Sequence, residues 1–207
     1  MTDRVEKILE KLQKLEGSRE ADEQALDLME EIASTPEGLD VLVERYANTS
    51  IPIFARSLSF LLAQAASSPA RNIAPLIFHL IERLRCREDE STLLNTLTAI
   101  QRQLIAGHSW QPPALPRPVL YPFLMHCLGQ SVLVKRGAVA VLSRLHSKGL
   151  LATVFDSTQL MSLRRELKQI SELKNEYLND ELVDLAGFLE NERGETAGRG
   201  NGEQANS

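Results

Sequence analysis

Residues 118–149, PVLYPFLMHCLGQSVLVKRGAVAVLSRLHSKG, decide how the rest of the chain is interpreted. An apolar stretch that begins at a proline leads into the short polar turn GQS. A second stretch follows, in which small and branched apolar residues recur three or four positions apart. That spacing is typical of an amphipathic α-helix, and proline suits the first turn of a helix. The segment therefore predicts two helices, near 118–128 and 132–147, that form a hairpin.

The second helix of this hairpin carries a pattern that recurs along the chain. Counted from a marker residue, apolar side chains stand at the second, fifth and ninth positions after it. The markers are Glu23, Arg56, Asn95, Arg136 and Asp180, and the intervals between successive markers lengthen from 33 to 44 residues. An interval near 40 residues is characteristic of stacked helical hairpins, in which each unit covers the apolar face of its neighbour. The period therefore predicts five hairpins.

Proline, glycine and polar clusters mark the breaks between helices. We expect an all-α fold with one domain over residues 1–192. The end of the chain, residues 193–207, is polar and rich in glycine, so we expect a disordered tail. The predicted helices are 3–15, 21–34, 37–47, 52–66, 70–86, 91–106, 118–128, 132–147, 158–172 and 175–192.

Residues 118–149 resemble an armadillo repeat, which has a helix begun by proline, a polar turn, and a helix with small residues and a Leu-x-x-Leu ending. Residues 37–67 look like a weaker copy, and the other units resemble HEAT repeats in their hydrophobic spacing. Over residues 20–190 the resemblance implies a right-handed α-solenoid of about five stacked hairpins, with the second helices on its concave side. The small residues and the final leucines of the segment are Gly137, Ala138, Ala140, Leu142 and Leu145.

Charge is unevenly distributed along the chain, whose net charge is −5. Residues 1–48 hold 6 Lys and Arg against 13 Asp and Glu, residues 49–148 hold 11 against 4, and residues 149–207 hold 6 against 11. The basic middle is either a set of solvated helix faces or a positive patch that recruits an acidic partner.

The polar positions of the central second helices are expected to line the concave face. Long basic side chains there suit an acidic protein segment, because guanidinium groups bind carboxylates through paired hydrogen bonds. Trp110, in a loop with four prolines, is either an interface anchor or a cover over exposed helix ends. The candidate partner-binding residues are Arg56, Gln101, Arg102, Lys135, Arg136, Arg144 and Trp110.

Catalytic motifs are absent from the sequence. It contains no glycine-rich phosphate-binding motif, no G-x-S-x-G and no zinc-ligand spacing. His126 and Cys127 are adjacent, so on a helix they point about 100° apart and do not form a nucleophile–base pair. His79 and His126 lie in apolar helical runs, where hydrogen-bonded core or boundary histidines are expected. We therefore expect no enzyme, no metal and no cofactor.

The sequence favours a non-catalytic adaptor or scaffold that binds an acidic protein segment. A nucleic-acid-binding solenoid is one alternative, which the acidic ends disfavour, and a chaperone cofactor or inhibitor that grips a folded partner is another. Cys86 and Cys127 are expected to be free buried thiols in a reducing compartment. With no apolar leader and no run long enough to span a bilayer, we expect a soluble cytoplasmic or nuclear protein without membrane insertion. The oligomeric state stays open.

Overall fold

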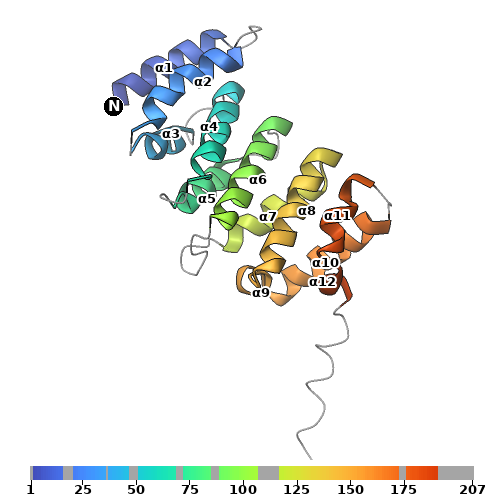
Figure 1. Ribbon diagram of the computed structural model, residues 1–207. Helices are drawn as coiled ribbons and strands as arrows, with labels where there is room; N and C mark the ends of the chain where they lie inside the picture. Colours follow the sequence, from blue (N-terminus) through green and yellow to red (C-terminus); the bar gives the residue numbers. More distant parts are fainter. Residues whose placement is uncertain are drawn as a thin grey trace, which may run out of the picture.

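The computed structural model describes residues 2–15, 21–35, 37–46, 51–68, 72–84, 89–106, 117–172 and 176–190. Within these ranges every regular element is a helix, and the predicted all-α class is confirmed (Figure 1). The elements are α1 (Thr2–Leu15), α2 (Ala21–Ala33), α3 (Gly38–Tyr46), α4 (Pro52–Ala65), α5 (Ala74–Arg83), α6 (Glu90–Ile105), α7 (Arg117–Leu128), α8 (Val132–Ser147), α9 (Leu151–Val154), α10 (Ser157–Glu172), the 3₁₀ helix η1 (Glu176–Leu178), α11 (Asn179–Val183) and α12 (Ala186–Glu190).

The helices pack in two rows that run along the molecule (Figure 1). In the first, α2, α4, α6, α8 and α11 each lie against the next, and we call this the second-helix row. In the other, α3, α5, α7 and α10 follow one another in the same way. The rows are joined where α3 meets α4, α5 meets α6, α7 meets α8 and α10 meets α11. Each helix of the two rows therefore contacts an adjacent helix of its own row and at least one helix of the other row.

The recurring apolar positions form the core between these rows, as the period predicts. Burying such side chains removes apolar surface from water and is the main favourable contribution to folding. Most of the fifteen positions are buried, and the remaining three, Leu28, Ala65 and Leu189, are partly buried against the same cluster. The buried ones are Ala25, Ile32, Leu58, Leu61, Leu97, Ile100, Leu104, Ala138, Val141, Leu145, Leu182 and Leu185.

Glycine lets α8 approach α6 closely. A Cβ atom at Gly137 would lie 3.0 Å from Cδ1 and 3.6 Å from Cβ of Leu97. The absence of a side chain at Gly137 therefore leaves room for Leu97 of α6. Gly149, with a φ of 66°, ends α8, because its left-handed conformation lets its N–H bond to the carbonyl of His146 at 2.8 Å.

The fifth helix is shorter than the predicted 70–86 and covers Ala74–Arg83. Pro75 belongs in its first turn, where the missing N–H costs nothing. The side chain of Asn72 accepts a hydrogen bond from the N–H of Ala74 at 3.1 Å, which favours a start at this point. Leu84 is extended and closes the helix.

The predicted last helix, 175–192, is broken into η1, α11 and α12. The N–H of Leu185 bonds to the carbonyl of Leu182, three residues back, at 3.1 Å. Leu182, Leu185 and Phe188 are all buried and stand three residues apart. Three residues per turn is the 3₁₀ period, so the tighter turn keeps these side chains on one face. A single α-helix was therefore the wrong prediction here, and the predicted tail, residues 193–207, lies outside the described residues.

Candidate interaction face

Six of the seven candidate residues lie on α4, α6 and α8 of the second-helix row. We call the exposed surface of these three helices the polar face. Trp110 lies outside the described residues. The six side chains fall into three groups. Arg56 and Arg136 pair with carboxylates, and Gln101 and Arg102 donate to main-chain carbonyls. Lys135 and Arg144 make neither kind of contact to the described residues.

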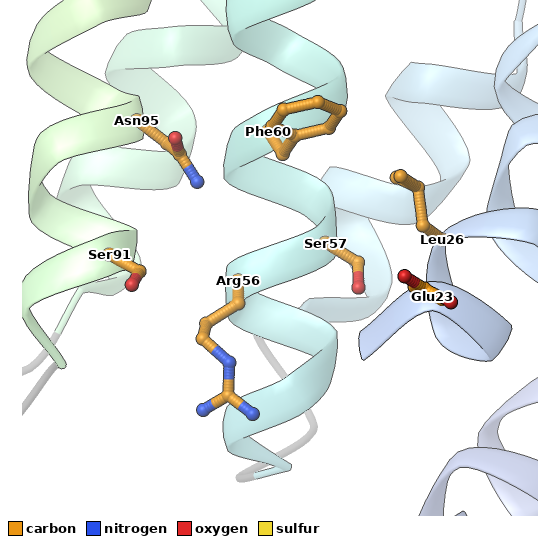
Figure 2. Close-up of a pocket in the computed structure, with 7 residues that line it drawn as sticks. All are labelled: Glu23, Leu26, Arg56, Ser57, Phe60, Ser91 and Asn95. Carbon is orange, nitrogen blue, oxygen red and sulfur yellow. The ribbon is translucent and has the colours of Figure 1, made fainter. Parts of the chain in front are cut away.

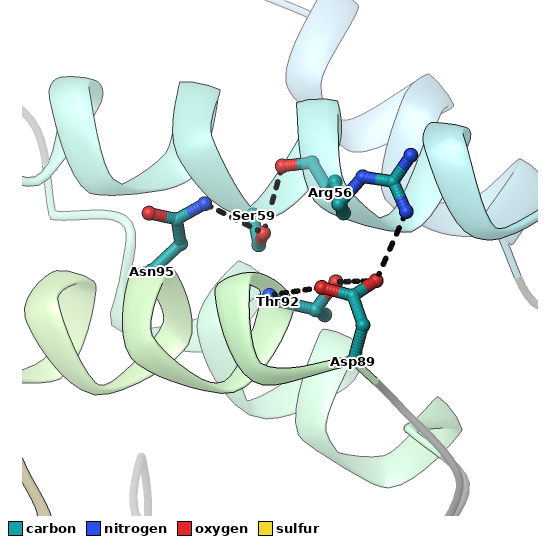
Figure 3. Close-up of polar contacts among 5 residues, drawn as sticks. All are labelled: Arg56, Ser59, Asp89, Thr92 and Asn95. Carbon is teal, nitrogen blue, oxygen red and sulfur yellow. Dashed lines mark hydrogen bonds and ion pairs between the residues drawn. The ribbon is translucent and has the colours of Figure 1, made fainter. Parts of the chain in front are cut away.

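Arg56 on α4 is joined to the start of α6 (Figure 3). Its Nη1 lies 3.4 Å from Oδ2 of Asp89, and both side chains are about one-third exposed. Asp89 is also the N-cap of α6, since its Oδ1 accepts from the N–H of Thr92 at 3.0 Å. The charge of Arg56 is therefore compensated within the chain.

Two candidates on α6 donate to main-chain carbonyls of the neighbouring helices. Gln101 Nε2 donates to the carbonyl of Gly137 on α8 at 3.2 Å. Arg102 Nη1 donates to the carbonyl of Ala63 on α4 at 2.8 Å. These bonds hold α6 between α4 and α8. The carbonyl that Arg102 binds carries no formal charge, so it does not balance the positive charge of the arginine.

Gln103 is a structural residue that the sequence did not single out. Its side chain is fully buried. Oε1 accepts from the N–H of Ile73 at 3.0 Å, and Nε2 donates to the carbonyl of Ala66 at 3.0 Å. Glutamine beside the apolar positions of α6 was the only signal, since a buried amide must find hydrogen-bond partners.

Arg136 on α8 pairs with an acidic side chain of α11, so it does not face outward without a partner. Its Nε donates to Oε1 of Glu181 at 2.8 Å, although 47% of the Arg136 side chain is exposed. This bond and the charge of Glu181, helped by Asp180, raise the pKa of Arg136 above its ordinary value. Nearby, Ser143 Oγ donates to Oδ2 of Asp184 at 3.1 Å. The acidic helix α11 thus already occupies this part of α8.

Lys135 and Arg144 complete the set. Arg144 is exposed and Lys135 is half-buried. Across the described ranges, neither side chain has a hydrogen bond or an ion pair to another residue. The polar face therefore carries three positive groups without a carboxylate partner among the described residues, at Arg102, Lys135 and Arg144.

Reactive groups do not gather on this face. Cys127 is buried and free, as expected, and burial raises the pKa of its thiol to about 12, so it is a poor nucleophile near neutral pH. Cys86 lies outside the described residues. His79 and His126 are half-buried on their helices, but a hydrogen-bonded histidine was the wrong expectation for His79, whose buried Nε2 has no partner among the described residues. In the part of the chain that the structure describes, no three His, Cys, Asp or Glu side chains are placed to hold a metal ion.

A cavity of about 240 Å³ lies at the edge of the polar face, between α2, α4 and α6 (Figure 2). Leu26 and Phe60 line it together with Glu23, Arg56 and Asn95. The sequence did not predict this cavity, because its walls come from three helices that lie far apart along the chain.

Comparison with known protein families, curated proteins and solved structures finds no match for this chain. None of the described helices is both long and apolar enough to cross a membrane. The geometry of the polar face is therefore what bears on the function of this chain.

Proposed function

We propose that this protein is a right-handed α-solenoid of the armadillo/HEAT type that works as a non-catalytic adaptor or scaffold. Its partner is an acidic protein segment, which lies along the polar face on the concave side. The fold part of the proposal is supported by the 33-to-44-residue period from Glu23 to Asp180 and by the helices of the second-helix row, which pack in chain order.

One observation carries the binding part. Arg102, Lys135 and Arg144 have no carboxylate partner among the described residues, whereas Arg56 and Arg136 do. An acidic segment that crosses α6 and α8 gains charge-assisted hydrogen bonds to the first group without breaking pairs that the chain already makes. The proposal therefore places the acidic segment on these three of the seven residues expected from sequence, and Trp110 stays a prediction.

Charge reversal on α8 tests this proposal. Lys135→Glu with Arg144→Glu is expected to remove an acidic partner recovered from a native extract by affinity purification and mass spectrometry. Lys11→Glu with Arg165→Glu changes the net charge equally at exposed positions on α1 and α10, and is expected to retain the partner. Far-UV circular dichroism should match the wild type in both. If the α8 variant retains its partners, or the control loses them equally, the proposal is wrong.

A further inference from the structure

Two cavities lie along the seam between α2 and α4, and we call them together the α2/α4 groove. The cavity of about 240 Å³ described above lies at one end, with Leu26 from α2 and Phe60 from α4 on its walls (Figure 2). A second cavity, of about 440 Å³, is lined by Ala33 of α2 and Leu61 of α4. On α2 the contributing residues recur three or four positions apart and so lie on one face of the helix, whereas on α4 they spread over two adjoining faces.

The groove is long enough for a short peptide segment. On α2 its lining runs from Glu23 to Ser34, which corresponds to roughly 16 Å along a helix axis. Phe60 is 37% exposed, an unusual state for a phenylalanine that borders a cavity, and Leu26 is only partly buried. Large apolar side chains of a partner would cover both residues and exclude water from them.

The α2 rim of this groove is acidic. Glu23, Asp27 and Glu30 are exposed and fall on one face of α2, at positions i, i+4 and i+7. None of the three carboxylates has a hydrogen bond or an ion pair to another described residue. The sequence of α2 contains no Lys or Arg. Arg56, the basic residue in the groove, is paired with Asp89.

We propose that the α2/α4 groove binds a short amphipathic segment of a protein partner. Large apolar side chains of that segment, three or four residues apart, enter the two cavities, and its Lys or Arg side chains pair with Glu23, Asp27 and Glu30. Charge complementarity selects this occupant, because the acidic rim repels nucleic acid, anionic lipid and acidic peptides. The proposed ion pairs use Glu23, Asp27 and Glu30 rather than Arg102, Lys135 and Arg144, and so the opposite charge, which means that this proposal does not rest on the function proposed above.

A random peptide library displayed on phage and selected on the full chain tests the assignment. We expect the enriched peptides to combine Lys or Arg with apolar residues three or four positions apart. Fluorescein-labelled copies of these peptides then allow affinities to be measured by anisotropy. Glu23→Lys with Glu30→Lys is expected to weaken binding at least tenfold, and so is Phe60→Ala. Glu37→Lys with Glu44→Lys, which changes the charge equally outside the groove, is expected to change it less than twofold.

Three results would overturn the assignment: no enrichment, enrichment of acidic peptides, or basic peptides that bind both groove variants as tightly as the wild type. Thermal melts of each variant exclude unfolding as the cause of a loss. Peptides that depend on Lys135 and Arg144 but ignore the groove variants would count against the groove and in favour of the polar face. The two proposals therefore fail separately.

Discussion

At the scale of single residues, Gln103 joins three helices through one buried amide. Ala66 is the C-cap of α4 and Ile73 is the N-cap of α5. The main-chain groups at helix ends lack partners within their own helix, and both of these find one on Gln103. This side chain ties the end of α4 to the start of α5.

Replacing Gln103 by methionine should therefore destabilise the protein markedly. Methionine has a similar size but leaves a buried N–H and a buried carbonyl without partners, at a cost of about 1–3 kcal/mol each. The free energy of unfolding, measured by urea denaturation, should fall accordingly. Gln101→Met is the matched control, because it removes a single, half-buried bond and should cost less. Equal losses in the two variants would contradict this role for Gln103.

The sequence could predict which side chains are long, polar and outward on the second helices, and Arg102, Lys135 and Arg144 keep that role. It could not predict that Arg56 and Arg136 are compensated. Their acidic partners lie 33 and 45 residues further along, and such pairs depend on how hairpins pack. A spacing rule within one helix contains no information about those contacts.

At the scale of elements, the contact between α6 and α8 depends on a glycine, Gly137, which has no side chain to separate the two helices. Gly137 faces Leu97 and Leu94 of α6, and the nearest of these atoms is only 3.0 Å from where a Cβ would stand. That atom is a terminal methyl carbon, which can shift by a few tenths of an ångström. A methyl group at position 137 is tolerable, whereas a larger side chain must push the helices apart.

We expect Gly137→Leu to lower the free energy of unfolding by about 1–3 kcal/mol, the usual cost of overpacking. Gly137→Ala should be nearly neutral, because the strain is offset by a helix-propensity gain of about 1 kcal/mol. Gly187→Leu, on α12, is the control, since the nearest neighbour to its Cβ is 3.9 Å away. Thermal melts and urea unfolding of the three variants measure these effects. A large loss with Gly137→Ala would mean that the helices cannot adjust.

Helix ends were the least predictable part of the elements. Apolar periodicity locates the middle of α5, but its first residue depends on Pro75 and on the side chain of Asn72. In the last unit, the same periodicity fits an α-helix and a 3₁₀ turn. The choice between them depends on which of Leu185, Phe188 and Leu189 the neighbouring helices bury.

At the scale of the whole molecule, the larger contacts between the described helices join elements that lie near one another along the chain. Helices α4, α6 and α8 each pack against a preceding and a following helix of the second-helix row. Helices α1 and α12 are the first and last helices of the described chain. Helices α2, α4, α6, α8 and α11 pack in chain order, which is the order that the predicted period requires, and the solenoid itself stays a proposal. The period could not predict the acidic groove or the ion pairs of Arg56 and Arg136, because both depend on side chains from several hairpins.

Native-state hydrogen exchange should reveal this gradient. Backbone amides of α4, α6 and α8 are expected to exchange most slowly, and those of α1 and α12 to exchange fastest, because the end helices can open without disrupting the centre. Mass spectrometry of peptic fragments, at a pH where opening is fast compared with exchange, measures it. Uniform protection across all helices would indicate a single cooperative unit and contradict the expectation.

Gln101, Arg102 and Gln103 all donate to main-chain carbonyls, at Gly137, Ala63 and Ala66. Every residue type supplies such a carbonyl, so the three bonds demand a particular amino acid only on the donor side. During evolution the accepting positions are free to vary as long as their size suits the packing. The helices on either side of α6 can therefore diverge in sequence at these carbonyl positions and keep their connections to it.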